Sequence, residues 1–386
     1  MKKALIFTGG GVTKVLNATI YGVVKAAKEN KIKIMGGIGG WGSLMDKSRF
    51  VDLNGLDIEG IQDIGGTFLR SSRTNPFKSD DGIRQVLDKV KKNNIDYIIP
   101  IGGDNTMLTA RKLFEDHGLN IVSVPKTIDN DLNGTYYTPG FPSAAAYISD
   151  YCSLTKRDVA MSYKGIFITE VMGGTAGWLA ASGVFGDADL IIPPEKEVKL
   201  SHFFDVLMKK YEENNKFASV VVSKEAKFDD KSITSIKGGN KEDQYGLTLS
   251  ENITWDLKRK ITEELKVPCR NVNPGHIVSS GAPIAIDRDL AIELGRKSIE
   301  LIKEKQFGEM TNLVRLSDDS LDVQSVHLKK VVGDDNYKTL PDNFFDYKKL
   351  NVTEKFFDYM FPILGTYKQK HTKYYQLLRQ VFKHQE

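Results

Sequence analysis

The chain has 386 residues, which allows two or three domains of ordinary size. Its 54 lysine and arginine residues nearly balance 50 aspartate and glutamate residues, and the net charge of +4 is too small to indicate a protein dedicated to nucleic acids or membrane surfaces. Hydrophobic residues make up 40% of the chain and charged residues 27%, so we expect a globular protein rather than a disordered one.

The two cysteines, Cys152 and Cys269, are too few for a disulfide framework or a cysteine-rich zinc site. A single bridge between them stays open, although reduced thiols are expected. The N-terminal apolar run Ala4–Phe7 is too short for the core of a signal peptide. Apolar residues never run together for the ~18 positions that a membrane span needs. We therefore expect a cytoplasmic protein.

Short apolar runs alternate with helical patterns through the first 225 residues. We expect strands at residues 3–7, 96–101, 120–124, 165–171 and 218–222, and helices at 17–30, near 84–94 and after 106. Buried strands that alternate with helices predict an α/β fold, in which parallel sheets carry helices on both faces.

A glycine or acidic cluster follows each of the five expected strands. The clusters are Gly9–Gly11, Gly102–Thr106, Pro125–Asp131, Met172–Gly174 and Ser223–Glu225. Ligands of open α/β sheets bind at the edge where strands end and helices begin. The repeated placement of these clusters therefore predicts a binding site at the carboxyl ends of the strands.

Two of the clusters have the properties of phosphate-binding loops. Gly9–Gly11 would let the backbone approach a ligand closely, and the helix that follows favours an anion. An ordinary tight turn is the alternative. Asp104 adds a carboxylate beside Gly102 and Gly103, and a carboxylate near phosphates requires a cation such as Mg²⁺ between them. Thr106 is expected to cap the next helix, and a capping role alone would leave Asp104 without a function.

The segment Pro125–Asp131 carries two carboxylates two residues apart. One of Asp129 and Asp131 can accept a proton from a hydroxyl while the other helps to hold a metal. Lys126 supplies positive charge for phosphoryl oxygens. The alternative is an aspartate-rich turn, since this composition is common in turns.

Two further segments have no chemistry of their own. Residues 226–245 are polar without a sustained period, which predicts a surface excursion or hairpin. Near the C-terminus, Tyr374, Leu378, Val381 and Phe382 have helical spacing, so we expect an amphipathic helix that packs on the body or on a partner subunit. Its lysines and tyrosines are interpreted as a solvated basic face rather than as a nucleic-acid site.

Seven segments together resemble the phosphofructokinase family of the non-ribokinase type. They are Gly9–Asn17 with the following helix, Gly65–Phe77, Gly102–Thr106, Pro125–Phe141, Glu170–Ala180, Ser223–Glu225 and Gly275–Gly295. The resemblance implies two Rossmann-like lobes with mainly parallel sheets and an active site in the cleft between them. The donor lobe would comprise residues 1–140 and about 278–330. The sugar lobe would comprise 141–277 and about 331–386, including the helical tail.

The resemblance also implies a role for each matching residue. Asp129 would be the base that deprotonates the 1-hydroxyl of fructose 6-phosphate, assisted by Thr127, Asp131 and Arg73. The implied donor site consists of Gly10, Gly11, Arg73, Gly103, Asp104, Asn105, Thr106 and Lys126, with Asp104 linked to the cofactor Mg²⁺. The implied substrate site consists of Thr127, Asp129, Met172, Gly173, Glu225, Arg270 and His276.

In this family the phosphate group of the sugar is held by a cluster that is completed across a subunit interface. The resemblance therefore implies a homodimer or homotetramer, with Arg270 or Lys164 near the interface.

Residues 105 and 126 depart from the pattern of ATP-using members, which usually have glycine at the first position and often at the second. Here they are Asn105 and Lys126, whereas pyrophosphate users typically have aspartate and lysine. A side chain at 105 would crowd the α-phosphate of ATP, and Lys126 could bind the far end of pyrophosphate. Thr109, where ATP users have glycine, points the same way. These residues favour pyrophosphate, and ATP stays open.

The acceptor site departs from the family pattern as well. The family usually has arginine at the positions of Gly174 and Ser279, and the arginine that crosses between subunits is replaced in this region only by Lys164. Fructose 6-phosphate is the leading acceptor, and another sugar, polyol or sugar phosphate is the alternative. A lipid or NAD kinase has no reason to retain residues 275–286, and a non-catalytic regulatory subunit has no reason to retain Asp129.

Overall fold

The computed structural model describes residues 1–45, 49–233, 253–333, 337–365 and 380. The chain forms two compact units, Met1–Ser143 with Ser279–Lys338 and Ala144–Val278 with Thr339–Glu386. The sequence placed the corresponding limits at 140/141, 277/278 and 330/331. The proposed C-terminal amphipathic residues, and residues 234–245 of the expected excursion, lie outside the described ranges.

Unit 1 is built on an eight-stranded, mainly parallel sheet with the order β12-β11-β6-β5-β1-β2-β3, and β4 pairs with the end of β1. Only the pairs β2–β3 and β11–β12 are antiparallel among its described strands. The strands are β1 (Lys3–Gly9), β2 (Lys33–Gly37), β3 (Phe50–Asp52), β4 (Ser71–Ser72), β5 (Tyr97–Gly102), β6 (Val122–Pro125), β11 (Glu309–Arg315) and β12 (Leu321–His327).

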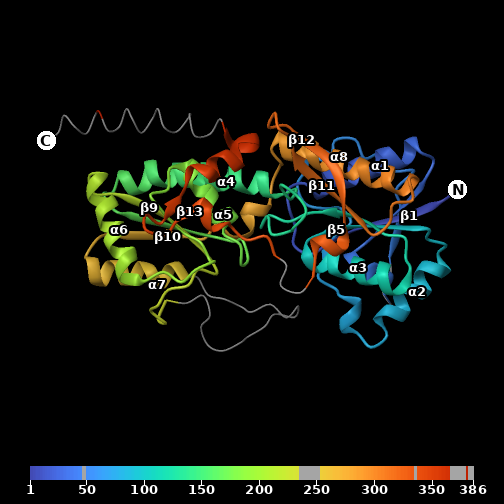
Figure 1. Ribbon diagram of the computed structural model, residues 1–386, viewed down its shortest axis with the longest axis horizontal. Coiled ribbons are helices and arrows are strands. Elements are labelled where there is room, and N and C mark those ends of the chain that lie inside the picture. Colours follow the sequence, from blue (N-terminus) through green and yellow to red (C-terminus); the bar gives the residue numbers. More distant parts are fainter. Residues whose placement is uncertain (46–48, 234–252, 334–336, 366–379, 381–386) are drawn as a thin grey trace. The chain divides into compact units, whose positions relative to one another are not determined.

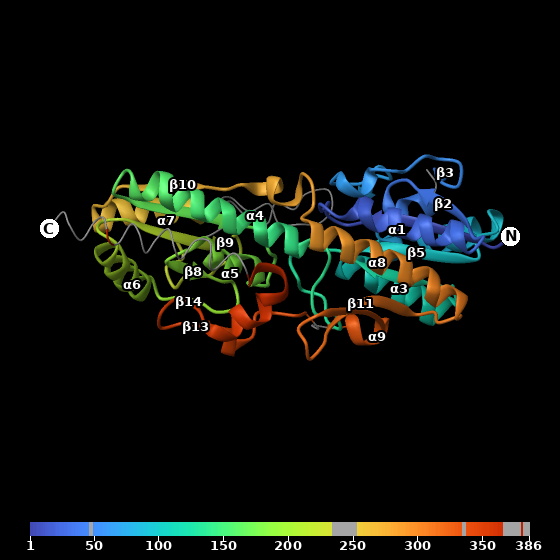
Figure 2. The ribbon, with the colours of Figure 1, turned by 90° about the horizontal axis from the view of Figure 1, so that it is seen from above.

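Helices cover both faces of this sheet. Figure 1 shows α1 (Leu16–Glu29) and α8 (Ala285–Lys303) on one side, and α2 (Gly82–Lys92) and α3 (Asp104–His117) on the other. Because both faces are covered, β1 is a continuous apolar run in which Ala4–Phe7 are fully buried. Helices α1 and α8 run side by side (Figure 2) and approach closely, since a Cβ on Gly22 would lie 2.1 Å from the Ile292 carbonyl oxygen.

Unit 2 contains a fully parallel sheet with the order β10-β7-β9-β8. Its strands are β7 (Ile166–Val171), β8 (Leu190–Ile192), β9 (Ala218–Ser223) and β10 (Cys269–Val272), and a separate hairpin joins β13 (Phe345–Asp346) to β14 (Asn351–Val352). The helices are α4 (Phe141–Leu154), which begins in unit 1, α5 (Trp178–Ala181), α6 (Leu200–Glu213), α7 (Ile253–Lys260) and residues 354–365. Side chains of α6 and α7 pack with the strands in one buried core.

Short helical segments complete the described chain. They are α9 (Leu328–Val331), η1 (Gly40–Leu44), η2 (Ile61–Asp63), η3 (Pro76–Lys78), η4 (Thr155–Met161), η5 (Ser182–Gly186), η6 (Ile261–Leu265), η7 (Gly275–Ser279) and η8 (Asp342–Phe344). No helix in the described ranges is both long and apolar enough to cross a membrane.

The structure confirms the α/β fold class and the five expected strands, with ends that shift by at most two residues. The reason is that parallel strands with both faces covered are short, continuous apolar runs, which stand out in a sequence. Cys152 and Cys269 are both free and buried, so no bridge joins them.

Candidate active site

Four strands of unit 1 end at one edge of the sheet and carry the loops that the sequence singled out. In the parallel register, Thr8 of β1 is paired with Ser71 of β4 and with Ile101 of β5, and Gly102 is paired with Pro125 of β6. Hydrogen bonds extend this alignment into the loops. The Gly10 N–H donates to the Ser72 carbonyl at 2.9 Å, and the Lys126 N–H donates to the Gly102 carbonyl at 2.9 Å.

Thr106 does not cap α3, contrary to the expectation from the sequence. The N-cap is Gly103, which makes no side-chain capping bond, and Thr106 is buried in the first turn. Its hydroxyl lies 2.4 Å from the place that a Cβ on Gly102 would take and 2.6 Å from that of Gly9. The two strand ends are therefore glycine because the Thr106 side chain fills the space above them.

Lys126 places its ammonium group beneath the glycine loop. The residue is 2% exposed, and its Nζ donates a 2.5 Å hydrogen bond to the Gly11 carbonyl. Gly10 has φ of +79°, a left-handed conformation that favours glycine. Burial lowers the pKa of Lys126 to about 8, and the nearby charge of Asp129 opposes this shift. A partly desolvated ammonium at this point is suited to bind a phosphoryl oxygen.

Asp129 and Asp131 form a desolvated carboxylate pair. Burial raises the pKa of Asp129, and burial together with the charges of Asp129 and Asp104 raises the pKa of Asp131. The Thr127 hydroxyl accepts a hydrogen bond from the Asp129 N–H at 3.1 Å, which fixes the turn. The buried Oδ1 of Asp131 has no hydrogen-bond partner in the described part of the chain. The pair is thus able to take up a proton near neutral pH.

Arg73 and Asp104 complete the charges at this edge. The exposed Arg73 follows β4, and its positive charge acts on both Lys126 and Asp129. Asp104 is the first residue of α3 and is partly buried. The described residues contain no group of three or more metal-ligating side chains. Mg²⁺ characteristically binds one or two carboxylates and completes its shell with water and phosphate oxygens, and the carboxylate of Asp104 fits that donor set.

Asp287 supports the site from the first turn of α8 and was not predicted as a site residue. It is fully buried and accepts hydrogen bonds from the Gly140 N–H at 3.0 Å, the Ser143 N–H at 3.0 Å and the Ser143 hydroxyl at 2.5 Å. Gly140 in turn forms a β-bridge with Thr127. Asp287 therefore anchors the far end of the loop that begins at Lys126.

In unit 2, Met172, Gly173 and Glu225 come together at adjacent strand ends. Val171 is paired with Ser223, and the Lys224 N–H donates to the Val171 carbonyl at 2.8 Å. Beside them is a surface hollow of about 500 Å³, lined by Thr175, Pro194, Glu195, Lys196, Glu225, Lys227, Thr339, Leu340, Pro341 and Asp342. Its lining mixes apolar side chains with lysines and carboxylates, and Glu225 is among them.

Arg270 does not join these residues within the chain. It is paired with Phe167 near the start of β7, five residues before Met172, a separation of roughly 16 Å along a strand. Arg270 is exposed on the edge strand β10 and lies 4.3 Å over the Tyr163 ring. His276 is exposed in η7, and Lys164 is exposed just before β7.

The two positions at which the sequence departs from the acceptor pattern have structural explanations. Gly174 has φ of +56°, a conformation that an arginine would adopt only with strain. Ser279 is buried. Neither residue presents a cation to a ligand.

Glu170 was also missed by sequence reasoning. It is buried at the end of β7 and accepts a 2.8 Å hydrogen bond from the Asn273 side chain, which follows β10. Burial raises its pKa. Glu170 thereby ties the loop that contains His276 to the strand that carries Met172.

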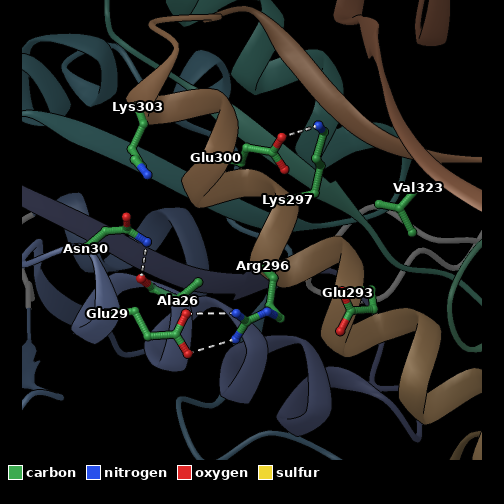
Figure 3. Close-up of a pocket in the computed structure, with 9 residues that line it drawn as sticks. All are labelled: Ala26, Glu29, Asn30, Glu293, Arg296, Lys297, Glu300, Lys303 and Val323. Atoms are coloured by element: carbon green, nitrogen blue, oxygen red, sulfur yellow. Dashed lines mark hydrogen bonds and ion pairs between the residues drawn. The ribbon is translucent and has the colours of Figure 1, made fainter.

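A second hollow, of about 340 Å³, lies in unit 1 between α1 and α8 (Figure 3). Its charged side chains are largely paired, with Glu29 and Arg296 2.8 Å apart and Lys297 and Glu300 2.9 Å apart. It is formed mainly by α1 and α8, with Val323 of β12, rather than by the loops at the carboxyl ends of the strands. We therefore do not assign it to the candidate active site.

The sequence and the fold of this chain both match known proteins. The family model described as phosphofructokinase matches residues 3–302. A pyrophosphate–fructose 6-phosphate 1-phosphotransferase from Dictyoglomus thermophilum is 35% identical over 305 residues, covering 78% of this chain and 87% of that protein. The ATP-dependent 6-phosphofructokinase 3 of Streptomyces coelicolor is 34% identical over 342 residues, covering 87% and 96%.

The crystal structure of a pyrophosphate-dependent phosphofructokinase from Nitrosospira multiformis superposes with a TM-score of 0.83 and 24% identity, covering 94% of this chain and 91% of that one. This likeness establishes the fold. A relative named for pyrophosphate and one named for ATP are almost equally similar to this chain, at 35% and 34% identity.

Proposed function

Because this chain belongs to the phosphofructokinase family, we propose that it transfers a phosphoryl group from pyrophosphate or ATP to the 1-hydroxyl of fructose 6-phosphate. The observation that carries the proposal is the cluster of Lys126, Asp129, Asp131, Asp104 and Arg73 on neighbouring strand ends. Phosphoryl transfer depends on positioning and charge neutralisation, and this cluster supplies a base and cations beside glycine loops.

Asp129 is the proposed base. Its ionised carboxylate takes the proton of the 1-hydroxyl as that oxygen attacks the terminal phosphorus. The bond from this phosphorus to the bridging oxygen breaks, and phosphate (from pyrophosphate) or ADP (from ATP) leaves. Thr127 holds the turn that carries Asp129. Arg73 and Lys126 neutralise charge on the phosphoryl oxygens, and the Gly10–Gly11 loop, which has no side chains, leaves room for the donor to approach the backbone. Asp131 shapes the site beside the base. Asp104 would hold Mg²⁺, which when bound neutralises the negative charge of the donor phosphates.

Pyrophosphate is the proposed donor. Asn105 is exposed at the start of α3. By the resemblance of this chain to the family, the Asn105 side chain would crowd the α-phosphate of ATP. Lys126 supports the choice because its buried ammonium lies against the glycine loop. Thr109, where ATP-using members have glycine, is buried, and its hydroxyl donates a 2.9 Å hydrogen bond to the Asn105 carbonyl. It therefore packs within the helix.

The proposed acceptor site combines Met172, Gly173 and Glu225 with a phosphate-binding cluster that includes His276 and Arg270. The exposed position of Arg270 on an edge strand supports a homo-oligomer in which Arg270 and Lys164 lie near a subunit interface and serve a neighbouring copy. Another sugar, polyol or sugar phosphate is a second candidate acceptor, favoured by the absence of a cation at Gly174 and Ser279.

A panel of acceptors assayed with pyrophosphate and with ATP, each with Mg²⁺, tests the proposal. We expect turnover of fructose 6-phosphate, with a higher kcat/KM for pyrophosphate than for ATP. A chain that uses only ATP would contradict the donor assignment. A chain that uses neither donor on fructose 6-phosphate, but phosphorylates another acceptor, would contradict the acceptor assignment.

The pH profile should reflect the desolvated base. Burial raises the pKa of Asp129 to about 6, and only its ionised form accepts a proton. Because each pH unit below the pKa reduces the ionised fraction about tenfold, kcat/KM should fall on the acid side near pH 6 rather than near the ordinary aspartate value of about 4. Initial rates measured between pH 5 and 9 check this, and a rate that stays level down to pH 5 would argue against it.

A further inference from the structure

Lys338 is the last residue of unit 1. It contacts the loop that carries Asp131 and that directly follows Asp129. Its Nζ donates hydrogen bonds to the Tyr136 carbonyl at 2.5 Å, to the Thr135 carbonyl at 3.1 Å and to Asn130 Oδ1 at 3.3 Å. Its own N–H donates to the Asp131 carbonyl at 2.8 Å. Lys338 thus contacts the loop at four residues between Asn130 and Tyr136, and this loop begins directly after Asp129.

The loop makes a sharp turn at its start. Asn130, between the two aspartates, has φ of +55°, a left-handed conformation that asparagine tolerates better than most residues with a side chain. Its Oδ1 accepts hydrogen bonds from the Thr138 N–H at 3.1 Å and from Lys338. Lys338 therefore stabilises the backbone turn that determines where the Asp129 carboxylate points.

Lys338 also faces the charge of the site. Burial lowers the pKa of this lysine to about 7, and the charge of Asp131 raises it. The charges of Asp129, Asp131 and Asp104 at this edge act on one another, and the charges of Lys126 and Arg73 act on Asp129. Lys338 approaches from the opposite end of the loop.

We propose that Lys338 is a positioning residue for the reaction, which holds the Asn130–Tyr136 loop so that Asp129 is aimed at the acceptor hydroxyl. Lys338 makes no contact with substrate in this assignment and acts through the loop. The inference rests on the proposed function, because it concerns the orientation of the proposed base.

The test compares Lys338→Met with the wild type in steady-state assays of fructose 6-phosphate phosphorylation. Methionine retains the length of the side chain and removes all of its donors. A small misplacement of a catalytic group can cost on the order of 100-fold in rate, so we expect kcat to fall by roughly 10- to 100-fold. KM for fructose 6-phosphate should stay within about threefold, because the residues assigned to bind the acceptor are unchanged.

Lys338→Arg retains the charge and the donors, so its kcat should lie between those of the wild type and Lys338→Met. Lys329→Met is the matched control, since Lys329 is an exposed lysine of α9 in the same unit, and its kcat should equal that of the wild type. Circular dichroism and thermal melting establish that each variant is folded. Should Lys338→Met fail to fold, Lys338→Gln, which removes the charge and has a shorter side chain whose amide keeps two N–H donors, should likewise lower kcat.

The outcomes separate this inference from the proposed function. A wild-type kcat in folded Lys338→Met or Lys338→Gln would overturn the positioning role. So would an equal loss in Lys338→Met and Lys338→Arg, or a loss that appears only as a raised KM. If the wild type itself does not phosphorylate fructose 6-phosphate with either donor, the proposed function fails instead.

Discussion

Asp129→Asn is expected to lower kcat by roughly 10²- to 10⁴-fold, the usual contribution of a general base. Asparagine has nearly the same size as aspartate and can occupy the same turn, but it cannot take the proton of the 1-hydroxyl. The dissociation constant of fructose 6-phosphate should change little, because asparagine still fills this position and the other residues proposed to bind the sugar phosphate are unchanged. Steady-state kinetics and equilibrium binding measured on the same preparation check both parts of the prediction.

Asp116→Asn is the matched control for this substitution. Asp116 is an exposed aspartate of α3 in the same unit, and its replacement should leave kcat at the wild-type value. If Asp129→Asn keeps more than about a tenth of the wild-type kcat, the base has been misassigned. A large loss of fructose 6-phosphate binding would instead indicate that Asp129 acts mainly in holding the acceptor.

The sequence predicted the part of the site in unit 1 that depends on local order. Glycines and carboxylates that directly follow a parallel strand must lie at its carboxyl end, and neighbouring strands bring such ends together. Lys126, Asp129 and Asp104 are therefore close in space because β5 and β6 are neighbours. The burial of Lys126 and Asp129 could not be predicted from local sequence, since it depends on packing by side chains that are distant in the chain.

Other features required contacts between distant residues. Lys338 is 208 positions from Asn130, and a lone lysine after a polar stretch gives no local signal of its role. Thr106 was expected to cap α3 because capping residues are predicted from residue type. The position of its hydroxyl is instead set by packing against the ends of β1 and β5. Arg270 was grouped with Met172 by resemblance, and only the register of β10 with β7 shows that they lie apart in one chain.

The substitution pair Asn105→Gly and Lys126→Gly is expected to reverse the donor preference. Loss of the Lys126 ammonium removes a charge-assisted contact to phosphate worth ~1.5–3 kcal/mol, which corresponds to a fall of roughly 10- to 150-fold in kcat/KM for pyrophosphate. Removal of the Asn105 side chain opens space at the start of α3, so kcat/KM for ATP should rise. Both values are measured at saturating fructose 6-phosphate and Mg²⁺.

Lys126→Met separates the loss of charge from the gain of space. Methionine keeps the side-chain length without the ammonium, so this variant should lose activity with pyrophosphate and gain none with ATP. Asn105→Gly alone should gain activity with ATP while it keeps most of its activity with pyrophosphate, because Lys126 remains in place. Donor choice would lie outside these two positions if the double variant retained the wild-type ratio of the two kcat/KM values. In that case the loop Val12–Val15, which follows Gly9–Gly11 at the end of β1, would be the next segment to replace in a test of donor choice.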